Sequence, residues 1–251
     1  MSAELLDLGN LLGWAVVLTY LRVQACILAM PGFGERVLLG RVKIAIAMAL
    51  APILTETGSA LEAPPTLIVL LGVAAAELLL GFAVGTLVRL LAFSINIAAT
   101  AIAATASLSQ IIGAPNEASP HPIGNIFHLG GIAILLAMGL PIMLVRLLAD
   151  SLALWPVGRL PDAEGLLTEL VAILAHSFEL AMVLAAPFIL GGFLFQALSG
   201  VINKVMPALP VVFIGAPAAI MLALVALALL TPLLMGVWVD AVLSLQLGFS
   251  R

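Results

Sequence analysis

The feature that most constrains this chain is a series of long apolar stretches separated by short polar or Pro/Gly-rich connections. The stretches cover residues 11–30, 42–55, 66–93, 126–148, 166–198 and 208–239. About 20 apolar residues cross the hydrocarbon core of a bilayer as a helix, and lipid does not tolerate open strands or exposed irregular backbone. The sequence therefore predicts an all-α, multi-pass integral membrane protein of about six helices. Because their lengths are uneven, we expect some of them to be kinked.

The composition excludes most other classes of protein. Hydrophobic residues make up 64% of the 251 residues and charged residues only 9%, whereas about a quarter of a soluble domain is charged. The net charge of -4 does not suit nucleic acid, which requires a basic surface. A single cysteine, Cys26, cannot form an intrachain disulfide. We therefore expect membrane lipid around the chain, no separate soluble domain and no nucleic acid partner.

The sequence lacks the common catalytic and metal-binding motifs. It contains no G-x-S-x-G, H-E-x-x-H, Walker A or C-x-x-C pattern. His176 and Glu179 are three residues apart, so they share one face of a helix. A di-iron bundle would need a second such pair and further glutamates. We therefore expect no enzymatic activity, no cofactor and no metal, and only a local polar contact between His176 and Glu179.

Ionisable residues inside the apolar stretches are the next candidates for a functional role. Glu77, Arg89 and Glu179 are such residues, together with Arg22 and Lys204. A charge in hydrocarbon is costly and usually faces a partner or water. Two interpretations stay open: a proton- or solute-coupled transporter in which Glu77 or Glu179 titrates, or a structural role in which each charge pairs with another helix or reaches the membrane boundary.

A weakly polar stretch without charge follows the third apolar stretch. Residues 94–110 are mostly small or mildly polar, which suits either close helix packing or the lining of a wet lumen. The most polar part of the chain, residues 107–125, follows directly, and a loop of this length is usually functional. Leu108, Ile111 and Ile112 are apolar side chains that would seal a lumen by dewetting.

The segment 203–217 predicts a break between helices. A polar pair, Asn203-Lys204, interrupts the apolar sequence and is followed by three prolines. Proline has no amide hydrogen and disrupts a regular helix, so backbone groups in this segment must bond to neighbouring subunits or water. An ordinary loop between helices is the alternative. The candidate residues for the helix break and a subunit contact are Asn203, Lys204, Pro207, Pro210, Gly215 and Pro217.

Three stretches together carry a resemblance to a known family. They are residues 36–52, which include Arg41-Val42-Lys43 and end in Ala51-Pro52; residues 77–85, Glu-Leu-Leu-Leu-Gly-Phe-Ala-Val-Gly; and residues 203–217, Asn-Lys-Val-Met-Pro-Ala-Leu-Pro-Val-Val-Phe-Ile-Gly-Ala-Pro. In this order and spacing the chain resembles the FliR family, the membrane subunit of the flagellar type III protein export gate. The SctT proteins are its relatives in virulence secretion. The similarity runs over almost the whole chain.

The resemblance implies a structural subunit of a protein-conducting channel for flagellum assembly, in the bacterial inner membrane at the flagellar basal body and raised toward the periplasm. The implied partners are FliP-like and FliQ-like gate subunits, an FlhB-like subunit and exported unfolded proteins. Residues 1–165 would form a FliP-like part and residues 166–251 a FliQ-like part. The loop at 107–125 would contain the plug of the gate. The candidate plug residues are Leu108, Gln110, Ile111, Ile112 and Gly113.

Overall fold

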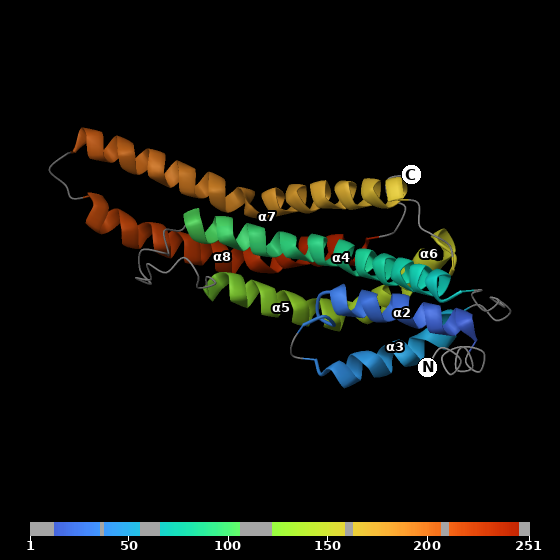
Figure 1. Ribbon diagram of the computed structural model, residues 1–251. Coiled ribbons are helices and arrows are strands. Elements are labelled where there is room, and N and C mark those ends of the chain that lie inside the picture. The colour runs from blue at the N-terminus through green and yellow to red at the C-terminus, as the bar shows by residue number, and fades with distance from the viewer. Residues whose placement is uncertain are drawn as a thin grey trace. The chain divides into compact units, whose positions relative to one another are not determined.

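The computed structural model describes residues 13–35, 38–55, 66–105, 122–158, 163–206 and 211–245. These residues form helices joined by turns, and no strand occurs among them. The helices are α2 (Trp14–Ala29), α3 (Gly40–Leu54), α4 (Leu67–Thr105), α5 (Pro122–Met138), α6 (Leu140–Leu154), α7 (Ala163–Val205) and α8 (Val211–Leu243), as Figure 1 shows. The predicted all-α class is confirmed.

Three of these helices are long and apolar enough to cross a membrane: Leu67–Ile102, Glu164–Val205 and Pro217–Leu243. The pair α5 and α6 would make a fourth span, bent by 72°. Helices α2 and α3 have 16 and 15 residues, fewer than the roughly 20 that a full crossing needs. The multi-pass character is therefore confirmed. The described residues contain three or four full-length spans, whereas the sequence has six apolar stretches.

Gly139 makes the bend between α5 and α6. Its φ is 127°, in the region that residues with a side chain rarely adopt. Its amide donates to the carbonyl of Leu135 at the end of α5, and its own carbonyl accepts from the amide of Met143 in the first turn of α6. Pro141 lies in that first turn, where a missing amide hydrogen leaves no bond unmade.

Two helix ends differ from the sequence prediction. Helix α4 continues to Thr105 instead of ending at residue 93, because the alanines after that point favour a helix. Helix α5 begins at Pro122, inside the predicted loop 107–125, and proline suits the first position of a helix. Residues 106–121 lie outside the described part of the chain.

The prediction that Pro217 would prevent a regular helix is wrong, because Pro217 lies inside α8. A proline removes one helical hydrogen bond, but apolar helices of membrane proteins tolerate this since neighbouring groups and small local adjustments satisfy the freed carbonyl. Pro187 in α7 and Pro232 in α8 are also interior. Long apolar helices therefore continue through prolines that would end a helix in water.

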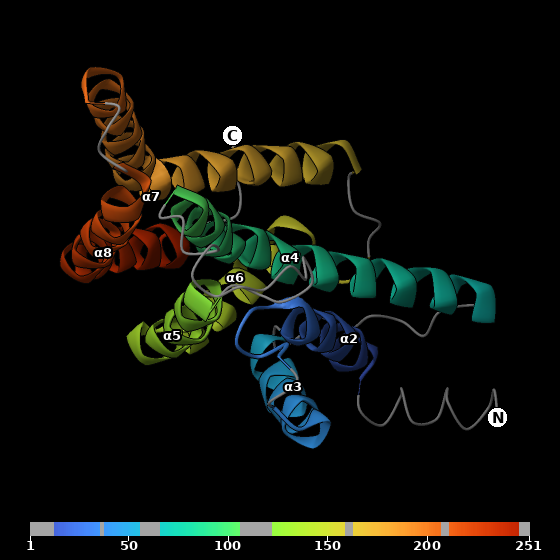
Figure 2. The same ribbon diagram turned by 90° about the vertical axis from the view of Figure 1, so that its left-hand side faces the viewer.

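The chain divides into two compact units. Unit 1 comprises Met1–Leu91, Leu135–Ala175 and Leu243–Arg251, and unit 2 comprises Ala92–Ile134 and His176–Val242. In unit 1, α2 and α3 lie side by side, as Figures 1 and 2 both show. In unit 2, Trp238 of α8 is almost fully buried and packs against Gly131 of α5, where an added Cβ would lie 2.8 Å from Cη2 of the indole.

Candidate functional site

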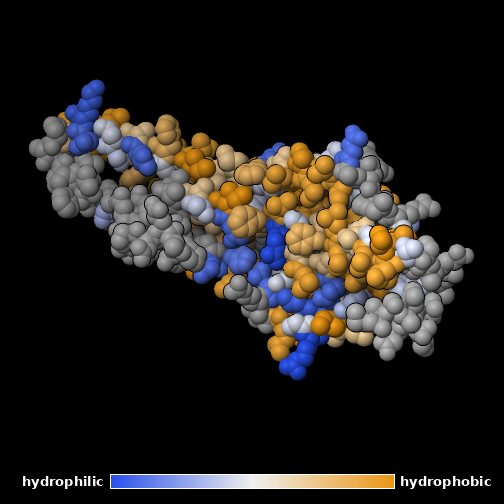
Figure 3. Space-filling view, in the orientation of Figure 1, coloured by the Kyte–Doolittle hydropathy of each residue, from blue (hydrophilic) through white to orange (hydrophobic). Residues whose placement is uncertain are grey.

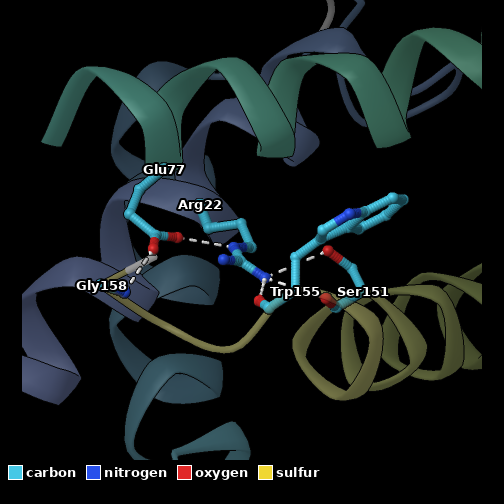
Figure 4. A network of polar contacts seen from close by, with 5 residues as sticks. All are labelled: Arg22, Glu77, Ser151, Trp155 and Gly158. Atoms are coloured by element: carbon cyan, nitrogen blue, oxygen red, sulfur yellow. Dashed lines mark hydrogen bonds and ion pairs between the residues drawn. The ribbon is translucent and has the colours of Figure 1, made fainter. Parts of the chain in front are cut away.

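The most distinctive site in the described residues is a buried ion pair between α2 and α4. Nε of Arg22 donates to Oε2 of Glu77 over 2.6 Å, and both side chains are fully buried. Figure 4 shows the two side chains pointing toward each other from their helices. Because the burial of an unpaired charge is strongly unfavourable, each residue requires the other. The pair therefore fixes α2 against α4.

The guanidinium of Arg22 also binds the end of α6. Its Nη1 donates to the carbonyl oxygens of Ser151, at 3.0 Å, and Trp155, at 2.8 Å, and to Oγ of Ser151 at 3.3 Å. The last carbonyls of a helix have no partner within the helix, and a positive charge is favourable at that end. Arg22 thus caps α6 while it neutralises Glu77.

The second oxygen of Glu77 holds the turn that follows α6. Oε1 of Glu77 accepts a hydrogen bond of 3.0 Å from the backbone amide of Gly158. The φ of Gly158 is 86°, a conformation available to glycine without strain. The network of Arg22, Glu77, Ser151, Trp155 and Gly158 therefore connects α2, α4, α6 and the turn that leads toward α7.

Two glycines let α2 and α4 approach closely beside this network. A Cβ added to Gly81 would collide with the backbone carbonyl of Arg22, and one added to Gly85 would lie 2.5 Å from the carbonyl oxygen of Cys26. Glu77, Gly81 and Gly85 are spaced by four residues, so they lie on one face of α4. Small residues at this spacing are a known device of membrane helix packing. The Gly81-x-x-x-Gly85 spacing is present in the sequence but was not among the predicted features.

Arg89 lies at the other end of α2, not in the interior of the unit. Its Nε donates to the carbonyl of Ala29 at 2.6 Å, and its Nη2 is 3.9 Å from Oε1 of Glu35. Nζ of Lys43 donates to the backbone carbonyl of Glu35 at 3.0 Å. Arg89 and Lys43 therefore hold the last turn of α2 and the loop after it, consistent with the predicted structural role of such charges.

Glu179 does not join the buried network. Its side chain is 74% exposed, and Oε2 lies 3.5 Å from Nδ1 of His176. The predicted local contact between these two residues is therefore confirmed. Within the described ranges, no three residues among His, Cys, Asp and Glu lie together in a way that would hold a metal ion.

A side chain of the weakly polar stretch at the end of α4 contacts α5 within unit 2. Nδ2 of Asn96 lies 3.3 Å from Nδ1 of His128 in α5, and both side chains are half-buried. Oγ1 of Thr100 donates to the carbonyl of Asn96, within the same helix. At Asn96 the structure favours helix packing, the first of the two interpretations of this stretch.

The other predicted site residues are placed only in part. Asn203 and Lys204 are exposed residues in the last turn of α7, and Gly215 and Pro217 lie in the first two turns of α8. The residues outside the described part of the chain are Leu108, Gln110, Ile111, Ile112, Gly113, Pro207 and Pro210.

Long apolar helices, joined in unit 1 by a buried ion pair and by glycine contacts, define a multi-pass helical membrane protein. The chain belongs to the family described as bacterial export proteins, family 1, whose sequence model matches residues 14–245. This match, together with the two relatives described next, confirms the predicted membership of the FliR family.

Two curated relatives are similar over most of their length. The flagellar biosynthetic protein FliR of Caulobacter vibrioides is 28% identical over 233 residues, which cover 90% of this chain and 92% of the relative. The flagellar biosynthetic protein FliR of Aquifex aeolicus is 26% identical over 221 residues, which cover 87% of this chain and 86% of the relative.

Proposed function

We propose that this chain is a structural subunit of a flagellar type III protein export gate, in which it assembles with FliP-like and FliQ-like subunits around a protein-conducting channel. The observation that carries the proposal is the family match over residues 14–245. Both relatives are named as flagellar proteins, which favours flagellar over virulence secretion. The gate lies in the inner membrane at the flagellar basal body, and an FlhB-like subunit and exported unfolded proteins are its further partners.

The length of α7 supports an assembly with other proteins. Its 43 residues correspond to about 64 Å along the helix axis, roughly twice the ~30 Å of the hydrocarbon core. Exposed apolar side chains nevertheless occur from Leu167 near its start to Val205 at its end. Figure 3 shows apolar side chains over much of the visible face. Lipid alone does not cover so long an apolar surface, so neighbouring subunits are expected to cover the rest.

The plug of the gate is proposed to lie in residues 107–121, the part of the predicted loop that precedes α5. In this proposal Leu108, Ile111 and Ile112 seal the lumen, with Gln110 and Gly113 beside them. Its support is the family membership and the position of the loop directly after the long helix α4. The segment from Asn203 to Pro217 is proposed as a subunit contact, since it lies where α7 ends and α8 begins.

We propose that two parts of the chain correspond to two different kinds of gate subunit. Residues 1–165 correspond to a FliP-like subunit and residues 166–251 to a FliQ-like subunit. The role of the chain in the gate is structural and not catalytic. The mechanism is steric: helices pack around a lumen, apolar side chains exclude ions, and displacement of the loop opens the path.

The alternative of a coupled transporter receives no support from Glu77. Both carboxylate oxygens of Glu77 are held, one by Arg22 and the other by the amide of Gly158. A relay at this position would have to break the contacts that join α2, α4 and α6.

The proposal is tested by co-expression of the tagged chain with the FliP-like and FliQ-like subunits of the same organism. We expect a complex with a fixed ratio of subunits after mild detergent extraction, and loss of motility on deletion of the gene, restored by the intact chain. A monodisperse single chain, purified without companions although all three proteins are present in the membrane, would contradict the proposal.

A further inference from the structure

The burial of α7 and α8 changes partway along each helix. In unit 2, the buried residues are Ser177, Leu180, Ala181, Leu184, Ala185 and Phe188 of α7, and Leu234, Met235, Trp238, Val239 and Val242 of α8. None of the described residues in 189–206 and 217–233 is buried. The two helices therefore have a packed base, residues 176–188 and 234–242, and an outer arm, residues 189–206 and 217–233, that the described part of the chain leaves uncovered.

A proline lies at the boundary between base and arm in each helix. Pro187 directly precedes Phe188, the last buried residue of α7, and Pro232 lies two residues before Leu234, the first buried residue of α8. An interior proline removes the hydrogen bond to the carbonyl four residues earlier, and sharp kinks of helices occur at such positions. Figures 1 and 2 both show α7 bent where its colour changes from yellow to orange. The helical hydrogen bonding is therefore weakened where the packing ends.

Each helix has a second feature near the boundary that lowers its stiffness. Gly191 lies one turn after Pro187 in α7, and an added Cβ there would meet nothing within 4 Å. Packing therefore does not require this glycine, which weakens a helix relative to alanine. In α8, Oγ1 of Thr231 donates to the carbonyl of Leu227, a contact that often bends helices. Two different features thus weaken each helix close to the end of its packed part.

The base is held by contacts that the arm lacks. Trp238 of the base packs against Gly131 of α5, inside unit 2. The arm of α7 extends from residue 189 to the end of the helix at Val205, about 25 Å along the axis, without one buried side chain. Segments with few buried contacts are those that move most easily, and a hinge consists of a few residues that absorb the change of angle. The weakened turns at the boundary fit that description.

We propose that Pro187 and Pro232 form a hinge at which the outer arm changes its angle to the packed base, and that this movement accompanies the opening of the export gate. The hinge itself is independent of the proposed function, whereas its link to opening rests on it. Because the moving residues are the uncovered ones, the arm changes its angle while the contact of Trp238 with Gly131 is kept.

The first experiment measures the hinge by double electron–electron resonance in the assembled complex in lipid nanodiscs. Spin labels are placed at Met182 of the base and Leu198 of the arm, which are both exposed, while the native Cys26 is buried. We expect a broad distance distribution, which Pro187→Ala narrows about twofold and shifts to longer distances because the helix straightens. Labels at the exposed Leu224 and Val237 of α8 test Pro232→Ala in the same way.

Pro217→Ala is the matched control for both label pairs. Pro217 is also an interior proline of α8, but it lies within the arm and away from the boundary. We expect this variant to leave both distributions unchanged. Equal distributions in the wild type and Pro187→Ala, or an equal narrowing with Pro217→Ala, would overturn the hinge.

The second experiment tests the link between the hinge and gate opening. The double variant Pro187→Ala with Pro232→Ala keeps every buried side chain of the base. We therefore expect a complex with the normal ratio of subunits that secretes flagellar proteins at least about fivefold more slowly, because hinge residues control such conformational steps. Pro217→Ala should secrete at the wild-type rate. If the double variant does not assemble, the two single variants are compared in the same assay.

The proposals fail in different ways. If the wild-type chain recovers no gate subunit, the proposed function fails, and the distance distributions of the chain in nanodiscs still decide on the hinge. If the complex assembles and the straightened variants secrete at the wild-type rate, the proposed function stands and the link between the hinge and opening is refuted.

Discussion

Gly81 of α4 lies against the backbone carbonyl of Arg22 in α2, one helical turn beyond the glutamate that pairs with the Arg22 side chain. One residue of α2 thus makes both a backbone contact and an ion pair with the same helix. The close approach brings Glu77 within reach of the guanidinium, and the ion pair in turn holds the two helices at that distance. The joint between α2 and α4 therefore depends on both features.

Replacement of Gly81 by alanine is expected to destabilise the protein by about 1–3 kcal/mol, since a buried methyl group with no room forces the helices apart. The control is Gly72→Ala in the same helix, where an added Cβ meets nothing within 4 Å and the higher helix propensity of alanine is favourable. Thermal unfolding of the purified complex measures both variants. Equal melting temperatures for the two variants would show that the close approach of α4 to α2 at Gly81 does not contribute to stability.

Removing one charge of the buried pair is expected to lower the free energy of unfolding more than removing both charges. Arg22→Met leaves Glu77 buried without a cation, and Glu77→Met leaves Arg22 without an anion, at a cost of about 3–5 kcal/mol each. The double variant Arg22→Met with Glu77→Met leaves no buried charge. We expect it to be more stable than either single variant, which a double-mutant cycle of unfolding free energies measures. If the double variant lost as much unfolding free energy as the two single variants together, Arg22 and Glu77 would not be directly coupled.

Gly131 and Gly130 form a matched pair of positions in unit 2. An alanine at 131 would press its Cβ into the indole of Trp238, while one at 130 meets nothing within 4 Å. We expect Gly131→Ala to lower the unfolding free energy by about 1–3 kcal/mol and Gly130→Ala to change it little or raise it slightly. Chemical denaturation followed by tryptophan fluorescence measures the difference. Similar curves for the two variants would argue against the packing of α5 on α8.

Replacement of Ile111 and Ile112 by glycine is expected to raise ion leakage through the assembled gate, because the proposal assigns to these two apolar side chains the exclusion of water from the lumen. Conductance of the purified complex in planar bilayers measures this leakage. The valine pair Ile111→Val with Ile112→Val keeps the apolar character and should stay closed. An unchanged conductance of the glycine variant, in a complex of normal subunit composition, would remove these residues from the plug.

The apolar stretches predicted the helices well, because the requirement for internal hydrogen bonds in lipid leaves few alternatives to a helix. The stretches starting at residues 66, 166 and 208 correspond to α4, α7 and α8. The prediction was less successful at helix ends. Pro217 did not stop α8, since neighbouring groups and small local adjustments satisfy the carbonyl that a proline frees in an apolar helix. Helix α4 continued to Thr105, since its last turns are rich in alanine, which favours a helix.

The sequence by itself determined the class of the protein, its helical character and its family, because these follow from local composition and from motifs within single stretches. It identified Glu77 and Arg22 as charges in apolar surroundings but not as partners, since 55 residues separate them and no periodicity connects two helices. Only the tertiary structure decided that pairing, because it depends on how closely Gly81 and Gly85 allow α4 to approach α2 and on where the end of α6 meets the guanidinium.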